Sequence, residues 1–183
     1  MLPRDPAAAA PSDREGVPRP EGTGATPPPH ARERPSDAAL VARIVEHHAY
    51  ERRALPYLVA LLPKVAGCHR RRNAKLGVLC DVGQELADAI ETNLDDEEHG
   101  LFPAILAGGS APDVVRGGLD RMSRHHRALA LFLARVRWLA DDFAVPPWAG
   151  RPYQVLMEEL AALEEDVLEH MHLEGALLGS RPA

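Results

Sequence analysis

The chain has 183 residues, of which 45% are hydrophobic and only 4% aromatic, a composition typical of one globular domain built largely from Leu, Val, Ile and Ala. Its net charge of −6, from 21 basic and 27 acidic residues, argues against a protein that binds nucleic acid by neutralising phosphates. No apolar run approaches the length of about 18 residues that a membrane span needs. The two cysteines provide no disulfide framework, and the first residues lack the apolar segment of a signal peptide, so we expect a cytoplasmic protein.

Residues 1–36 differ sharply in composition from the rest of the chain. They contain nine of the 17 prolines, one leucine, one valine and no aromatic residue. Such a segment buries too little apolar surface to offset the entropy of ordering it. We therefore expect a disordered, Pro- and Ala-rich tail over 1–36 and a folded domain over 37–179.

The remainder predicts four long helices separated by short connections, at about residues 37–65, 73–102, 112–144 and 152–178. Ser36 or Asp37 caps the first helix, and Gly67 is expected to end it. Pro103 is expected to end the second, and Ser110 to cap the third. Short connections between long helices favour an all-α, antiparallel up-down-up-down four-helix bundle.

Each predicted helix carries an apolar stripe at spacings of three and four, as a bundle helix requires. Each stripe is interrupted by one short polar patch. The patches lie at similar numbers of residues from the predicted turns, so at about 1.5 Å rise per residue they fall in one layer of the bundle. The inward-facing polar residues of this layer are His48, Glu51, Asn93, Glu97, His126, His170 and Glu174.

Burying several imidazoles and carboxylates in a Leu-rich core is costly unless a partner satisfies them. A single histidine on an apolar stripe is more often a hydrogen-bonded core residue, but four stripes that turn polar in the same layer favour a metal site. Glutamates can bridge two cations while histidines fill the terminal positions. Histidine and carboxylate ligands without thiolates favour iron or manganese over a structural zinc ion.

The neighbouring polar residues are expected to lie outside this layer. His47, His125 and His172 are displaced from the stripes and predict outer-face or supporting roles. Of the acidic run over 95–98, only Glu97 is expected to face inward.

Four segments resemble the repair-of-iron-centres proteins, di-iron members of the hemerythrin-like (HHE cation-binding) superfamily. They are IVEHHAYERRALP (44–56), DDEEHGLFPAI (95–105), MSRHHRAL (122–129) and LEHMHLE (168–174). The resemblance covers about residues 37–178. It implies a hemerythrin-like bundle with two non-haem iron ions held by His48, Glu97, His126, His170 and Glu174, the two glutamates acting as bridges.

Two positions depart from the family pattern. Asn93 stands where the family has a histidine, which implies a depleted position for one of the two irons. Glu51 stands where the family usually has an apolar residue, so Asn93 and Glu51 are weak or substitute ligand candidates.

The resemblance implies repair of iron–sulfur clusters under nitrosative or oxidative stress, with damaged iron–sulfur proteins as partners. It does not by itself make the protein an enzyme. Two alternatives remain: a hemerythrin-like module that binds or senses O2 or NO without turnover, and a degenerate, metal-poor interaction bundle. None of these functions calls for nucleic acid or a membrane as partner.

Overall fold

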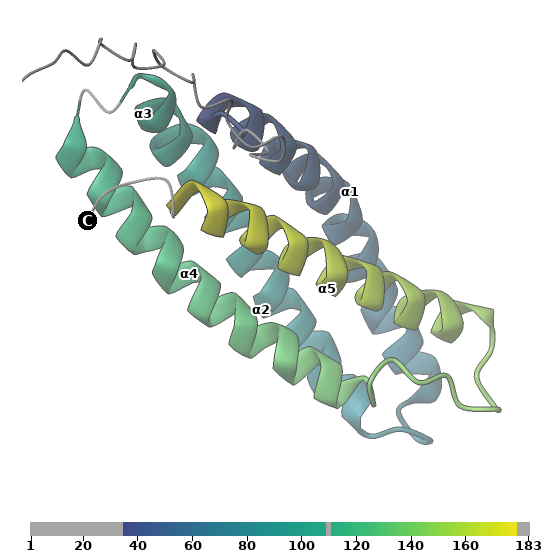
Figure 1. Ribbon diagram of the computed structural model, residues 1–183. Helices are drawn as coiled ribbons and strands as arrows, with labels where there is room; N and C mark the ends of the chain where they lie inside the picture. The colour runs from purple at the N-terminus through teal and green to yellow at the C-terminus, as the bar shows by residue number, and fades with distance from the viewer. Residues whose placement is uncertain (1–34, 109–110, 179–183) are drawn as a thin grey trace, which may run out of the picture. The chain divides into compact units, whose positions relative to one another are not determined.

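The computed structural model describes residues 35–108 and 111–178, which contain helices and no strand. Three of its helical elements follow one another without a break and form a single rod (Figure 1). This rod and the three remaining long helices make four helical rods, which confirm the predicted all-α bundle. The elements are α1 (Asp37–His69), α2 (Lys75–Asp96), the π-helical turn η1 (Glu97–Leu101), α3 (Phe102–Leu106), α4 (Pro112–Leu139) and α5 (Arg151–Leu178).

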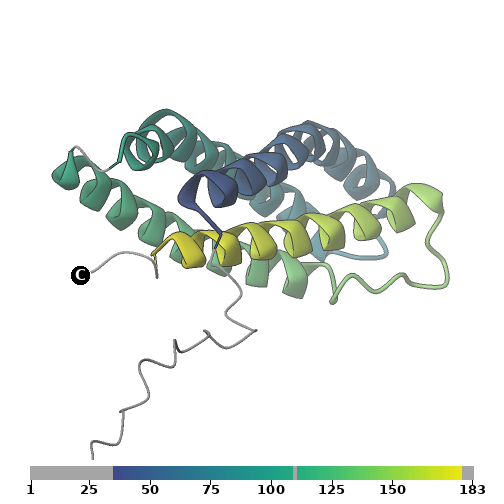
Figure 2. The same cartoon turned by 45° about the horizontal axis from the view of Figure 1, so that its top comes forward.

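The rods lie side by side in an antiparallel arrangement (Figures 1 and 2). Helix α1 packs against both α2 and α5, and α2 packs against α4. The expected tail over 1–36 lies almost entirely outside the described residues, as does the expected cap Ser110.

Helix α1 begins where the sequence indicates and ends later than expected. The hydroxyl of Ser36 accepts a hydrogen bond from the backbone N–H of Ala39 at 3.2 Å, which caps the first turn. At the other end the expectation was wrong, because the helix continues through Gly67 to His69. A helical glycine costs only about 1 kcal/mol relative to alanine, which the rest of a 33-residue helix easily tolerates.

Pro103 does not end the second rod, which continues to Leu106. In the π-helical turn before it, the N–H of Phe102 bonds to the carbonyl of Glu97, five residues back. Pro103 then occupies the first turn of α3, where its missing N–H costs little. Within the wider turn Leu101 is buried, whereas its neighbour Gly100 is partly exposed.

The apolar core is divided into two clusters. The larger fills the half of the bundle that contains the α1–α2 turn, and the smaller lies between the first turns of α1, the end of α5 and the η1–α3 segment. Gly118 of α4 allows close packing in the smaller cluster, because a Cβ there would lie 2.8 Å from Cδ1 of Leu101. A layer of buried polar side chains separates the two clusters.

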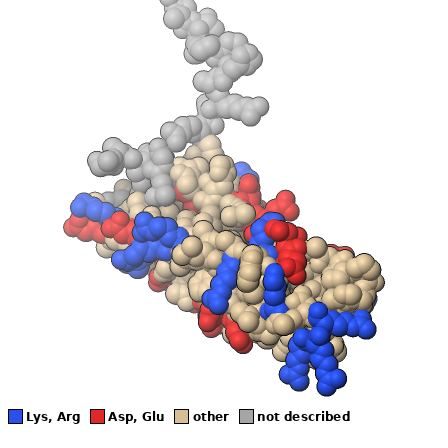
Figure 3. All heavy atoms as spheres, turned by 90° about the horizontal axis from the view of Figure 1, so that it is seen from below, with Lys and Arg blue, Asp and Glu red and all other residues tan. Residues whose placement is uncertain are grey.

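The surface carries charges of both signs. On the face seen in Figure 3, Lys and Arg side chains are interspersed with Asp, Glu and uncharged residues. Within the described residues, no helix combines the length and the apolar character needed to cross a membrane.

Candidate metal centre

All four rods contribute side chains to the polar layer. Six of the seven predicted residues are at most 1% exposed, and the side chain of His126 is 15% exposed. Helix α1 provides His48 and Glu51, the α2–η1 rod Asn93 and Glu97, α4 His126, and α5 His170 and Glu174. Residues one helical turn apart share a face of a helix. The polar residues of each helix therefore point together into this layer.

Four of these side chains converge most closely. Each of His48, Glu97, His170 and Glu174 offers a ligand atom that lies within 4.8 Å of the other three. The Nε2 atoms of His48 and His170 are 3.3 Å apart. Oε2 of Glu97 lies 3.4 Å from the first of these nitrogens and 3.6 Å from the second.

His126 lies on the other side of the two glutamates. Its Nε2 is 2.7 Å from Oε2 of Glu174 and 3.9 Å from Oε1 of Glu97. The ring of His170 lies closer to that of His48 than to that of His126, with centroids 4.7 Å and 6.5 Å apart. Both glutamates thus lie close to Nε2 of both His126 and His170.

Several buried carboxylate oxygens of this layer have no hydrogen-bond partner among the described residues. Both carboxylate oxygens of Glu97 and of Glu174, and Oε2 of Glu51, are buried without one. Each such charge costs several kcal/mol when it is removed from water without compensation. A divalent cation would satisfy these oxygens and the Nε2 atoms that face them, so the residues present fit a metal centre.

The pKa values of His170 and Glu174 in the metal-free protein reflect the same convergence of side chains. Burial by itself lowers the pKa of a histidine, but the close carboxylates of Glu174, Glu51 and Glu97 outweigh burial and raise the pKa of His170 from 6.5 to about 12. Burial raises the pKa of a carboxyl group, but the close imidazoles of His126 and His170 and their charges lower that of Glu174 from 4.5 to about 2. A metal ion must therefore displace a proton from His170.

These shifts predict how the stability of the metal-free protein depends on pH. The raised pKa of His170 stabilises the fold fully below its unfolded value of 6.5, and this contribution is lost as pH rises towards 12. The lowered pKa of Glu174 stabilises the fold fully above 4.5, and this contribution is lost as pH falls towards 2. We expect thermal unfolding in the presence of chelator, followed by circular dichroism, to show the highest midpoint between these limits.

The matched control for this pH prediction is His170→Ala. This variant should lose most of the decline in midpoint between pH 7 and pH 9. A wild-type midpoint that is constant over that range would contradict the proposed protonation of His170.

Asn93 occupies the layer without entering the closest cluster. Its Oδ1 accepts a hydrogen bond from Nδ1 of His125 at 3.1 Å, while its Nδ2 is buried and has no partner. Sequence spacing placed His125 off the stripe, and the structure agrees to the extent that its side chain remains 27% exposed. The amide of Asn93 thus leaves Nδ2 without a partner among the described residues. An imidazole at this position would be larger and a better metal ligand.

Two further carboxylates contact the clustered histidines from outside. Oε1 of Glu51 lies 2.9 Å from Nδ1 of His170, and Oε1 of Glu98 lies 2.8 Å from Nδ1 of His48. Sequence reasoning placed Glu98 on the solvated face; its side chain is in fact 27% exposed and also reaches His48. In the π-helical turn consecutive side chains diverge less than in an α-helix, so Glu98 and Glu97 both reach α1, and no residue pattern in the sequence marked that turn.

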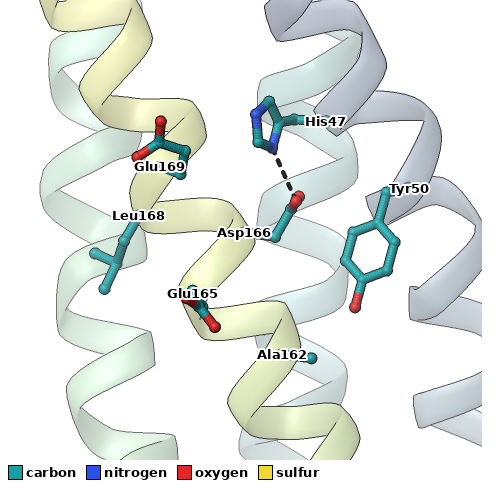
Figure 4. Close-up of a pocket in the computed structure, with 7 residues that line it drawn as sticks. All are labelled: His47, Tyr50, Ala162, Glu165, Asp166, Leu168 and Glu169. Atoms are coloured by element: carbon teal, nitrogen blue, oxygen red, sulfur yellow. Dashed lines mark hydrogen bonds and ion pairs between the residues drawn. The ribbon is translucent and has the colours of Figure 1, made fainter.

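The remaining histidines near the layer point elsewhere. His47 lines a surface pocket between α1 and α5, where its Nδ1 lies 2.8 Å from Oδ1 of Asp166 (Figure 4). His99 and His172 are exposed. None of these three belongs to the group of ligand atoms that converge.

Comparison with known proteins gives two findings. The model of the hemerythrin HHE cation binding domain matches residues 39–180. Proteins named iron-sulfur cluster repair protein YtfE are similar: that of Edwardsiella ictaluri (strain 93-146) is 28% identical over 158 residues, which cover 85% of this chain and 71% of the relative. Those of Musicola paradisiaca (strain Ech703) and Escherichia coli O157:H7 are 28% and 25% identical over 78% and 75% of this chain. The matched regions span 64% and 62% of these two relatives, so the chain matches less than two thirds of their length.

Proposed function

Because the chain belongs to the hemerythrin HHE cation-binding domain family, we propose that it is a non-haem iron protein that takes part in the repair of iron–sulfur clusters. The observation that carries this proposal is the buried layer in which imidazoles and carboxylates from all four rods converge. The names of the similar proteins support the repair role. We further propose that it acts in the cytoplasm, on iron–sulfur proteins damaged by nitrosative or oxidative stress.

The proposed ligands are His48, Glu97, His126, His170 and Glu174. Glu97 and Glu174 each have an oxygen within 4 Å of Nε2 of His126 and of His170, and they would be shared by two iron ions. The large apolar clusters on both sides of the layer keep water from it. Iron bound there would supply one-electron redox chemistry, or would itself be the cargo that is delivered to a damaged cluster.

A second candidate function is the binding of O2 or NO without turnover. The observation that favours it is Asn93, because its buried Nδ2 has no partner within residues 35–108 and 111–178 and could donate a hydrogen bond to a small ligand. In this case the depleted position would serve as the place where the ligand enters. Spectroscopic titration of the iron-loaded protein with NO under anaerobic conditions tests for this function.

Reconstitution of a damaged iron–sulfur enzyme tests the repair role. A [4Fe–4S] dehydratase inactivated by an NO donor is incubated anaerobically with the iron-loaded protein, and its recovered activity is measured. We expect recovery well above that given by the same concentration of free ferrous iron or by the Glu174→Ala variant. Recovery no greater than that with free iron would leave the ligand-binding function, and a protein that takes up no iron would leave only an interaction bundle.

A further inference from the structure

The two histidines that face each other in the metal centre are both held from behind by carboxylates outside the proposed ligand set. Nδ1 of His170 donates to Glu51, and Nδ1 of His48 donates to Glu98. The Nε2 atoms of both rings point towards each other and towards Glu97. An imidazole that donates from Nδ1 has its Nε2 lone pair available for a metal ion.

The two outer carboxylates differ in their surroundings. The side chain of Glu98 is 27% exposed and lies 3.4 Å from Nη2 of Arg52, so both water and a cation screen its charge. Glu51 is fully buried, and among the described residues no lysine or arginine forms an ion pair with it. Its charge therefore acts on the centre through a medium of low dielectric constant.

The position of Glu51 distinguishes between two roles: support of a histidine ligand, and direct coordination of the metal. Its Oε1 contacts Nδ1 of His170, the nitrogen on the side of the ring away from the convergent Nε2. Its oxygens are absent from the group of ligand atoms that lie within 4.8 Å of one another. A carboxylate in this place orients the imidazole and increases its basicity, as in carboxylate–histidine–metal triads.

We propose that Glu51 is a positioning residue that holds His170 with Nε2 directed at the metal and adds a buried negative charge next to the centre. This inference rests on the proposed iron centre. It assigns Glu51 a different role from that of a substitute ligand for the imidazole missing at Asn93. The hydrogen bond should govern how tightly iron is held, and the charge should favour the ferric over the ferrous state.

Two substitutions separate the hydrogen bond from the charge. Glu51→Leu removes both, and we expect it to weaken iron binding by about 10- to 100-fold, the usual cost of losing such a partner. Glu51→Gln retains an acceptor oxygen of similar size, so it should restore most of the affinity while moving the midpoint reduction potential to a more positive value. Competition with a chelator measures the affinity, and a spectroelectrochemical titration measures the potential.

The matched control is Glu164→Gln. Glu164 is a buried glutamate like Glu51, but it lies on α5 and pairs with Arg137 away from the centre. This variant should keep the affinity and the potential of the wild type. Circular dichroism of each metal-free variant checks that it folds, and if Glu51→Leu does not fold, the potential of Glu51→Gln decides the question.

Repeating the Glu51→Leu measurement in an Asn93→His background separates positioning from ligation. A positioning residue acts through His170, so its loss should weaken iron binding in both backgrounds. A substitute ligand would matter in the native background alone, and that result would overturn the proposal. Wild-type affinity and potential in both Glu51 variants would overturn it too, whereas a wild-type protein that binds no iron would refute the proposed function itself.

Discussion

Replacing Glu174 with alanine is expected to remove almost all iron from the protein. Oε2 of Glu174 lies 2.7 Å from Nε2 of His126 and 3.2 Å from Nε2 of His170, so the same carboxylate connects both sides of the centre. Its loss should weaken iron binding by more than about 100-fold, since removal of mere supporting partners already costs about 10- to 100-fold. Iron quantitation after anaerobic purification and loading measures the effect.

Thermal stability provides a second measurement for the same variant. Iron that binds only the folded state raises the unfolding midpoint of the wild type, by more the further the free iron concentration exceeds the dissociation constant. We expect added ferrous iron to raise the midpoint of the wild type and to leave that of Glu174→Ala unchanged.

His172→Ala is the matched control, because His172 lies two residues away on the same helix and is exposed. It should keep the iron content and the iron-dependent midpoint of the wild type. If His172→Ala instead empties the site while Glu174→Ala does not, the ligand face assigned to α5 is incorrect.

Replacing Asn93 with histidine is expected to increase the iron content towards two ions per chain. Asn93 is fully buried in the polar layer one turn before Glu97, the position from which a side chain reaches the centre. A neutral amide is a weaker ligand for iron than imidazole, so the wild type should hold fewer than two ions tightly. Iron quantitation and Mössbauer spectroscopy of protein loaded to saturation, then passed over a desalting column, measure the difference.

The new imidazole would displace the side chain of His125, which now donates to Asn93 and is partly exposed, so the change fits without disturbing the apolar core. Asn93→Ala is the control, because it also removes the contact with His125 and adds no ligand. Equal iron content and identical Mössbauer spectra for the wild type and Asn93→His would show that residue 93 does not limit occupancy.

The rods of the bundle and the contents of the polar layer could be predicted from the sequence. Apolar spacing of three and four identifies the buried face of each helix, and a residue that shares this face with leucines is buried with them. This is why His48, Glu51, Asn93 and Glu97 are correctly placed inside without knowledge of the tertiary structure. Short connections then bring the four polar patches to one level, because each helix rises by a fixed length per residue.

These rules could not predict local departures from regular α-helix geometry. Spacing rules assume a uniform α-helix, so they do not predict the π-helical turn at Glu97–Leu101. The turn carries the rod past Pro103 and moves Leu101 inward, and it also brings Glu98 to His48.

The partners of each polar side chain were also decided only by the tertiary structure. Sequence spacing says that Glu51 faces inward, but whether it meets a metal ion or a neighbouring ring depends on the rotation of α5 against α1. The structure brings its carboxylate to Nδ1 of His170, 119 residues away in the chain. Composition and periodicity thus determine which side chains are buried, and packing between helices determines which atoms meet, because contacts of a few ångströms depend on the relative rotation and depth of whole helices.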